Sequence, residues 1–473
     1  MHEVEIDAVP LDRLAALLDP DRVERLGEHV HAARRVLEGR TVWNVNATAT
    51  GGGVAEMLQA LLAYSRGAGV DARWLVLDGT PGFFALTKRL HNLLHGSPGD
   101  GGPLGEEERA AYERALRQNL DHLLRFVRPD DVVLLHDPQT AGLVPAVKAA
   151  GARVVWRSHI GRDTPNHLTE VGWEFLRPYV EGADAVIFSR AAYVPAWVDQ
   201  SKVWIIPPSL DPFTAKNTEI PPGDVEAVLR HAGLTLTTER RGRFLFTRRD
   251  GSTGLVRPHA GLIEGGHPVP NHGRVVLQVS RWDRLKDMAG VLTGFVEHLP
   301  RLPEDVQLML VGPETAGVTD DPEGAEVFAE CKALRLSLPE DARRRVHLCS
   351  LPMDDVDENA YLVNALQRYA TVVVQKSLLE GFGLTVTEPM WKGRPVIASR
   401  VGGIQDQIVD GESGLLLDDP TDLDAFGAAL DRVLGDPELA AELGRGAHER
   451  VRDHYLGDRH LIQYVDLFEQ LYR

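Results

Sequence analysis

Two glutamates stand on either side of a glycine-rich turn, and their chemistry suits a ligand that carries hydroxyl and phosphate groups. Glu380 comes immediately before Gly381-Phe382-Gly383. Glu388 lies eight residues after Glu380, on or near the first turn of a helix expected to begin near Leu384. Carboxylates accept hydrogen bonds from sugar and ribose hydroxyls, and N–H groups of a turn before a helix bind phosphate. Two glutamates on a helix surface are the simpler alternative.

Two cations follow a strand that the sequence predicts at 274–282. Arg281 and Lys286 come at and after its carboxyl end, where parallel sheets bind their ligands. An arginine can donate two parallel hydrogen bonds to a phosphate, and a lysine adds a compact point charge. Surface Arg and Lys residues are usually only solvated, so it is the position of this pair that indicates an anion site.

Three consecutive glycines, Gly51, Gly52 and Gly53, stand between the first predicted strand and an amphipathic helix. Residues without Cβ let backbone N–H groups approach an anionic ligand. A dinucleotide fingerprint fails on spacing, because Glu56 occupies the position of its third glycine. An ordinary glycine turn is the other interpretation.

Histidines offer a fourth kind of candidate. His159 follows the strand predicted at 152–159, although a lone histidine in such a place is often only structural. His91 and His95 share a helix face, which could suggest zinc. Asn92 stands where the glutamate of an HExxH motif would be and no third ligand is evident, so we expect no metal site.

The elements that must position these residues are short β-branched runs that alternate with amphipathic helices. Such alternation is typical of parallel sheets with crossover helices. The predicted strands of a first series lie at 41–46, 72–79, 131–137, 152–159, 183–189 and 202–209, and those of a second series at 274–282, 305–313, 345–351, 371–377 and 394–403.

The pattern weakens between the two series, where a hairpin is predicted around Asp250-Gly251. We therefore predict an α/β protein with two Rossmann-like, doubly wound parallel-sheet domains that face each other across a cleft. The first covers 1–270 and the second 271–456, and a last helix at about 457–473 crosses back to the first.

Composition excludes several classes of protein. The chain has 473 residues, and 51 Lys and Arg residues against 69 Asp and Glu residues give a net charge of −18, which repels nucleic acid. Cys331 and Cys349 are too few for a disulfide framework, and we find neither an apolar leader nor an apolar stretch of membrane-spanning length. We expect a soluble cytoplasmic protein with no nucleic-acid or membrane partner.

The glutamates, the Gly-Phe-Gly turn, the two cations and Gly402-Gly403 together resemble the donor site of the family 4 retaining nucleotide-sugar glycosyltransferases, which have the GT-B fold. Segments of the first domain narrow the resemblance to the trehalose glycosyltransferring synthases, with retaining trehalose phosphorylases as close relatives. These segments are NATATGGGVAEML, FFALTKRLHNLLHG, LLHDPQTAGL, RSHIGRDTPN and IIPPSLDP.

The resemblance implies roles in binding the sugar-nucleotide donor. The cations would neutralise the diphosphate, Glu388 would hold the ribose, Glu380 would bind hydroxyls of the transferred glucose, and His159 would stand beside the anomeric carbon. His159, Arg281, Lys286 and Glu380 would thus be the catalytic residues. The backbone of the donor site would come from Gly51, Gly52, Gly53, Gly383, Leu384 and Thr385.

The resemblance also implies an acceptor site. Asp137, in His136-Asp137-Pro138, ends a predicted strand and is a candidate for acceptor hydroxyls, together with Gly52 and Asn166. Arg157 is a weaker candidate, and the roles of Arg162 and Asp163 stay open.

By this resemblance the chain would be a retaining glucosyltransferase that makes α,α-trehalose from an NDP-glucose and glucose. Its partners would be NDP-glucose, glucose and trehalose, it would need no cofactor and no metal, and it would form a homodimer. A retaining trehalose phosphorylase is one alternative. A catalytically inactive regulator that binds sugar nucleotides is the other.

Overall fold

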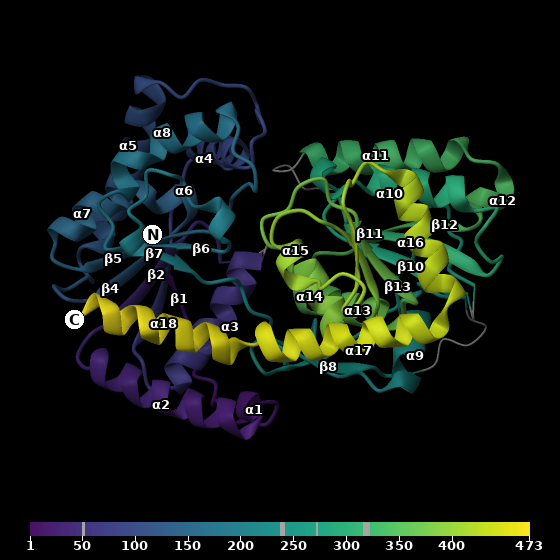
Figure 1. The fold of residues 1–473 in the computed structure, drawn as a ribbon, viewed down its shortest axis with the longest axis horizontal. Coiled ribbons are helices and arrows are strands. Elements are labelled where there is room, and N and C mark those ends of the chain that lie inside the picture. Colours follow the sequence, from purple (N-terminus) through teal and green to yellow (C-terminus); the bar gives the residue numbers. More distant parts are fainter. Residues whose placement is uncertain (50–52, 237–241, 271–272, 316–321) are drawn as a thin grey trace. The chain divides into compact units, whose positions relative to one another are not determined.

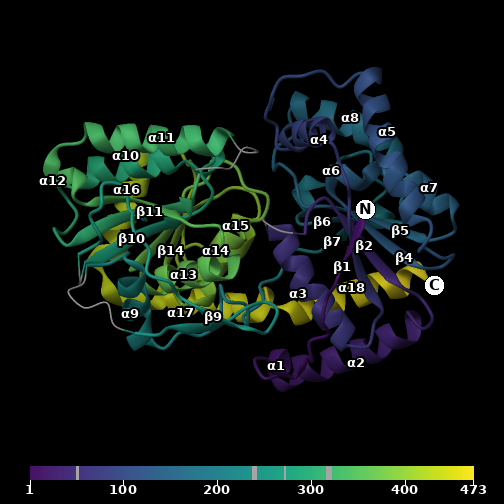
Figure 2. The same cartoon turned by 180° about the vertical axis from the view of Figure 1, so that it is seen from behind.

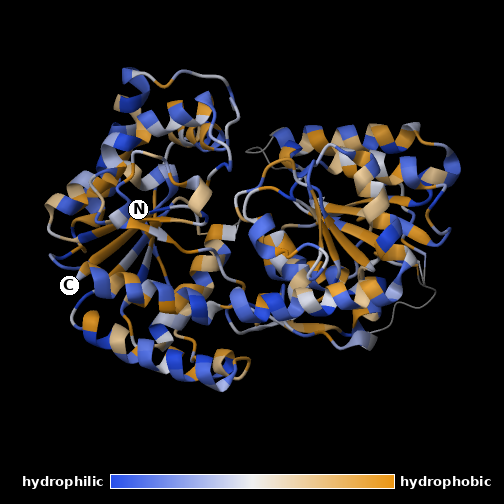
Figure 3. Ribbon diagram, in the orientation of Figure 1, coloured by the Kyte–Doolittle hydropathy of each residue, from blue (hydrophilic) through white to orange (hydrophobic). Residues whose placement is uncertain are grey.

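The computed structural model describes residues 1–49, 53–236, 242–270, 273–315 and 322–473 (Figure 1). The chain forms two compact units, of which one comprises Met1–Ser209 with Tyr455–Arg473 and the other Leu210–His454. Each unit is built around its own sheet, and Figure 3 shows that the strands of both sheets are largely hydrophobic, whereas most helices carry one polar and one apolar side. This is the burial pattern expected of a sheet covered by helices on its faces.

The first unit holds a seven-stranded sheet in the order β1-β3-β2-β4-β5-β6-β7. Six strands run parallel, as the alternation of strands and helices predicts, and β1 adds an antiparallel edge beside β3 that the sequence analysis did not anticipate. The strands are β1 (His2–Val4), β2 (Val42–Asn46), β3 (Ala72–Val76), β4 (Val132–His136), β5 (Arg153–Ser158), β6 (Ala185–Phe188) and β7 (Val203–Ile205).

Helices cover both faces of this sheet, and Figure 2 shows α2, α3 and α18 on one of them. The last helix belongs to the first unit, because Arg22 on α2 donates to both carboxylate oxygens of buried Asp458 at 2.8 and 3.0 Å. The helices are α1 (Asp12–Ala15), α2 (Pro20–Val36), α3 (Gly53–Gly67), α4 (Pro81–Leu94), α5 (Glu106–Leu123), α6 (Asp137–Thr140), α7 (Val144–Ala149), α8 (His167–Val180) and α18 (Gly457–Leu471).

The second unit holds a parallel sheet of six strands in the order β12-β11-β10-β13-β14-β15. Its strands are β10 (Arg274–Val279), β11 (Val306–Pro313), β12 (Val346–Leu351), β13 (Val372–Gln375), β14 (Val396–Ser399) and β15 (Leu415–Leu417). Its helices are α9 (Pro222–Ala232), α10 (Met288–His298), α11 (Pro322–Ser337), α12 (Glu340–Arg343), α13 (Val356–Tyr369), α14 (Leu384–Trp391), α15 (Ile404–Gln407), α16 (Leu423–Gly435) and α17 (Pro437–His454).

The predicted hairpin is present as β8 (Leu245–Thr247) and β9 (Thr253–Leu255), which pair antiparallel. It belongs to the second unit, because Arg248 forms a bidentate pair with Asp355 and the Phe246 ring stacks on that of Tyr361 at 5.1 Å. The units therefore divide at Ser209 and Leu210, which differs from the predicted boundary at 270. No helix of the described residues is long and apolar enough to cross a membrane.

Candidate active site

The ends of β4 and β5 bring two predicted residues of the first unit together. These strands are parallel neighbours, with His136 opposite Arg157, so the residues that follow them meet at one sheet edge. Asp137 Oδ1 accepts a hydrogen bond of 2.7 Å from the backbone N–H of His159. The backbone of Asp137 has φ +63°, a left-handed conformation that is strained for a residue with a side chain and is common at functional sites.

Burial sets the protonation of this cluster. It raises the pKa of Asp137 to about 7, although the N–H of His159 and the nearby Arg157 charge act in the opposite direction. Burial, together with the Arg157 charge, lowers the pKa of His136 to about 3 and that of His159 well below its ordinary value. The two histidines are therefore neutral at pH 7 and the carboxyl group titrates near it.

Arg157 takes no direct part in this edge of the sheet. Its side chain is fully buried and donates to His460 Nε2 at 3.0 Å, to the hydroxyl of Tyr464 and to the carbonyl of Ile206. Two of these partners lie on α18. The protein therefore holds this guanidinium on three sides, and its weaker role as an acceptor-site residue stays a prediction.

The other candidates of the first unit lie elsewhere or outside the described residues. Asn166 caps α8, where its Oδ1 accepts from Thr169 N at 3.0 Å and its Nδ2 donates to Gly96 O at 3.0 Å. Its acceptor role stays a prediction. Gly53 begins α3, whereas Gly51 and Gly52 lie outside the described residues.

The four remaining polar residues considered for this region make local contacts. His91 and His95 meet edge to face at 4.8 Å between ring centroids, Arg162 donates to the carbonyl of His95, and Asp163 pairs with Arg190 at 2.6 Å. Groups of three or more His, Cys, Asp or Glu side chains that could hold a metal ion are not found within the described ranges.

The second unit brings a predicted cation to a predicted carboxylate. Lys286 ends a short 3-10 turn, Arg284–Lys286, that follows β10, and its ammonium forms an ion pair with Glu380. Each side chain is 13% exposed. Arg281 is 57% exposed and pairs with Asp283 at 3.1 Å. Lys286 and Glu380 are therefore a preorganised, partly dried pair, and Arg281 is a more solvated charge.

A glycine turn places Glu380 at the start of α14. Gly383 has φ +87° and precedes Leu384, the first residue of the helix, as the sequence predicts. A Cβ on Gly383 would lie 3.1 Å from Glu380 Cγ. A second turn supports the first, since Gly403 donates to the carbonyl of Gly381 at 3.1 Å and a Cβ on Gly403 would lie 2.8 Å from Phe382 Cα.

The first turn of α14 has the chemistry of an anion site. No side-chain cap occupies this helix end in the described part of the chain, and the N–H groups of Leu384 and Thr385 belong to that first turn. The hydroxyl of Thr385 is buried and has no hydrogen-bond partner among the residues described. Backbone donors, a hydroxyl and the Lys286–Glu380 pair therefore lie around one glycine turn.

Glu388 occupies a separate, buried polar network. Gln367 Nε2 donates to Glu388 Oε2 at 3.1 Å, and Lys216 Nζ lies 3.5 Å from Glu388 Oε1. Lys392 Nζ donates to Gln367 Oε1 at 2.7 Å, and burial lowers the pKa of Lys392 to about 7. Lys392 also donates to the backbone carbonyl of Glu388 at 3.2 Å. None of these contacts was predicted from the sequence, although the i, i+4 spacing of Glu388 and Lys392 was a visible signal.

Comparisons with known proteins agree with a fold of two α/β units. Residues 44–195 match the family described as "Trehalose synthase, N-terminal domain", and residues 263–450 match "Glycosyl transferases group 1". The trehalose synthase of Pyrococcus horikoshii is 35% identical to this chain over 464 residues, which cover 98% of this chain and 96% of that protein. The chain belongs to the trehalose synthase family.

More distant proteins place this trehalose synthase family member in a wider group. A trehalose phosphorylase of Pleurotus pulmonarius is 27% identical and covers 86% of this chain, but the match spans only 54% of that protein. The solved structure of a sucrose-phosphate synthase from Thermosynechococcus elongatus has a TM-score of 0.64 at 20% identity and covers 92% of this chain and 99% of its own. The fold is GT-B, as predicted.

Titration of Asp137 gives a prediction for this family member. Because its folded pKa of about 7 lies above the ordinary value of 3.8, its contribution to stability is complete below pH 3.8 and is lost as the pH rises through 7. The free energy of unfolding of the wild type should therefore fall relative to that of Asp137→Asn between about pH 4 and 7. Denaturant titrations at several pH values measure this, and parallel curves for the two proteins would contradict it.

Proposed function

We propose that this enzyme transfers glucose from a nucleoside-diphosphate glucose to the anomeric hydroxyl of a second glucose, which gives α,α-trehalose with the α configuration of the donor retained. The near full-length similarity to a trehalose synthase supports the choice of product. The observation on which the chemistry depends is the Lys286–Glu380 pair at the first turn of α14.

The diphosphate gains negative charge as its bond to C1 breaks. Lys286, Arg281 and the N–H groups of Leu384 and Thr385 would stabilise that charge, because fixed donors in a partly dried site need no reorganisation when the charge develops. Glu380 would accept hydrogen bonds from hydroxyls of the transferred sugar, and Glu388 would hold the ribose. We propose that these protein charges suffice without a metal ion.

Retention follows if the acceptor approaches from the face that the diphosphate leaves. The bond between C1 and the phosphate oxygen breaks, a bond between C1 and the acceptor oxygen forms, and the departing phosphate takes the proton of the acceptor hydroxyl. A pair of carboxylates on opposite faces of the sugar, as in glycosidases, is then not required. Asp137 and His159 would bind acceptor and donor hydroxyls from the first unit.

The experiment that separates a synthase from a phosphorylase is to run the reaction backwards. The enzyme is given trehalose with a nucleoside diphosphate in one sample and with inorganic phosphate in another, and the products are identified. We expect NDP-glucose in the first sample and no reaction in the second. Glucose 1-phosphate in the second sample alone would identify a trehalose phosphorylase, and no product in either sample would favour a regulator that only binds.

The cellular setting is part of the same proposal. Cys331 and Cys349 are both buried and unpaired, which suits a reducing compartment, so we propose a cytoplasmic enzyme. The homodimer implied by the family resemblance stays a proposal as well.

A further inference from the structure

A buried hydrogen-bonded chain of three side chains ends at His159. Asn44 Oδ1 lies 3.1 Å from His136 Nε2, and His136 Nδ1 lies 3.1 Å from His159 Nε2. Asn44 and His136 are 2% and 1% exposed. This hydrogen-bonded chain runs from Asn44 on β2 through the end of β4 to the end of β5, so three neighbouring strands hold it in place.

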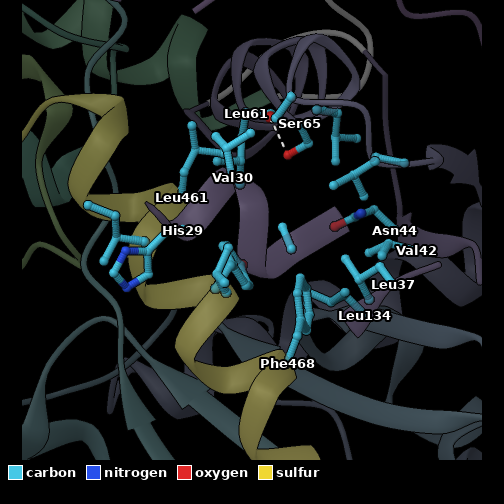
Figure 4. A pocket seen from close by; sticks show the side chains of 18 of the residues that line it. His29, Val30, Leu37, Val42, Asn44, Leu61, Ser65, Leu134, Leu461 and Phe468 are labelled. Carbon is cyan, nitrogen blue, oxygen red and sulfur yellow. Dashed lines mark hydrogen bonds between the residues drawn. The ribbon is translucent and has the colours of Figure 1, made fainter. Parts of the chain in front are cut away.

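Asn44 also faces the helices that cover the side of the sheet on which His136 lies. It lines an apolar cavity of about 50 Å³ that α2, α3 and α18 close over β2 and β4, and Figure 4 shows it there with Val42, Leu37 and Leu134. The hydroxyl of Ser65, another polar group in that view, is bonded to the carbonyl of Leu61 at 2.8 Å. The rest of the cavity lining near Asn44 is apolar, so the amide oxygen of Asn44 is directed toward His136, its polar partner.

The proton positions on the two histidines follow from the amide oxygen of Asn44. An amide oxygen can only accept, so His136 Nε2 must carry a proton. A neutral imidazole has one N–H, so His136 Nδ1 is bare and must accept from His159 Nε2. His159 Nδ1 is then bare in turn, and it has no hydrogen-bond partner in the described part of the chain.

We propose that Asn44 and His136 are positioning residues, which fix His159 as the Nε2–H tautomer so that its Nδ1 accepts a hydrogen bond from a sugar hydroxyl. The identity of that hydroxyl as a sugar's rests on the proposed function. Asp137, which accepts from the backbone of the same histidine, offers a second acceptor beside it. Two adjacent acceptors match a polyol, whose hydroxyls donate, and disfavour a bare phosphate oxygen.

The test is the tautomer itself, read by NMR of enzyme labelled with ¹⁵N in its histidines. Ring nitrogens with and without a proton have distinct ¹⁵N shifts, and the His159 signals are assigned by their loss in His159→Gln. We expect a protonated Nε2 and a bare Nδ1 in the wild type. A protonated Nδ1 in the wild type would overturn the proposal.

Substitutions then test the role of Asn44. Asn44→Leu removes the acceptor and should give a mixture of His159 tautomers with kcat lowered about 10- to 100-fold and little change in the donor KM, a size typical of lost histidine-orienting partners. Asn44→Asp keeps an acceptor oxygen and should restore the wild-type tautomer. Asn46→Leu is the matched control, because Asn46 lies on the same strand but bonds to Trp74 and Thr48.

The outcomes separate this proposal from the proposed function. Unchanged His159 signals and an unchanged kcat in Asn44→Leu would contradict the positioning role. The same tautomer mixture in Asn46→Leu would mean a general loosening of the sheet and would also count against it. A wild type with the expected tautomer but without trehalose formation would leave the tautomer assignment intact and reject only the proposed function.

Discussion

Replacement of Lys286 by alanine is expected to lower kcat by about 10²- to 10³-fold, which is the usual cost of a lost partner for transition-state charge. The ammonium lies in a partly dried site against Glu380, and no solvent cation would occupy its place in a fixed position. Single-turnover rates at saturating donor measure the effect on the chemical step. Arg281→Ala should lower turnover in the same range, since Arg281 is predicted to act on the same diphosphate.

The control lies two residues before Lys286. Arg284 belongs to the same short turn, carries the same charge and is 55% exposed, but it pairs with Glu326 and Glu330. Arg284→Ala should therefore leave the single-turnover rate within about twofold of the wild type, because a solvated surface pair contributes little. Full activity of Lys286→Ala, or loss of wild-type activity in EDTA, would refute the assignment of the leaving-group charge to the protein.

The second large effect is expected on substitution of the two glutamates, which should change different steps of the reaction. Glu380→Gln should lower the single-turnover rate about 10²-fold, because Glu380 is predicted to bind the sugar that is transferred. Glu388→Gln should instead weaken donor binding by about 10- to 100-fold, the usual worth of a hydrogen bond to a charged group, with a smaller change in rate. Isothermal titration with the nucleoside diphosphate and single-turnover kinetics separate the two quantities.

Glu326→Gln is the matched control for both variants, since this glutamate is 66% exposed and contacts Arg284. Neither binding nor rate should change in it. Equal changes of affinity and rate in Glu380→Gln and Glu388→Gln would show that the two carboxylates act on the same part of the donor, contrary to the assignment.

Much of the fold followed from local patterns, because a buried parallel strand must be rich in β-branched residues and its crossover helix must be amphipathic. The runs at 131–137 and 371–377 are examples of strands that the sequence locates within a few residues. Local patterns could not predict that the β8–β9 hairpin belongs to the second unit. It depends on Arg248 meeting Asp355, a pairing between residues more than a hundred positions apart.

The candidate site shows the same limit. The meeting of Asp137 with His159, and that of Lys286 with Glu380, follow from one rule, that residues at the carboxyl ends of parallel strands share a sheet edge. Arg157 obeys the rule in sequence but turns into the protein, because α18 supplies His460 and Tyr464 from the far end of the chain. The alternation of a strand gives the face on which such a side chain lies, but not which distant helix covers that face.

The most direct test of the central claim is NMR of the product that the enzyme forms from an α-linked NDP-glucose and free glucose labelled with ¹³C at C1. If the diphosphate leaves from the face that the acceptor attacks, as proposed above, the α configuration of the donor must be retained. We predict one disaccharide, α,α-trehalose, in which the labelled and the unlabelled anomeric centre both have the coupling of an α linkage. A β coupling at the unlabelled centre, or a disaccharide linked through another hydroxyl of the labelled glucose, would contradict the account.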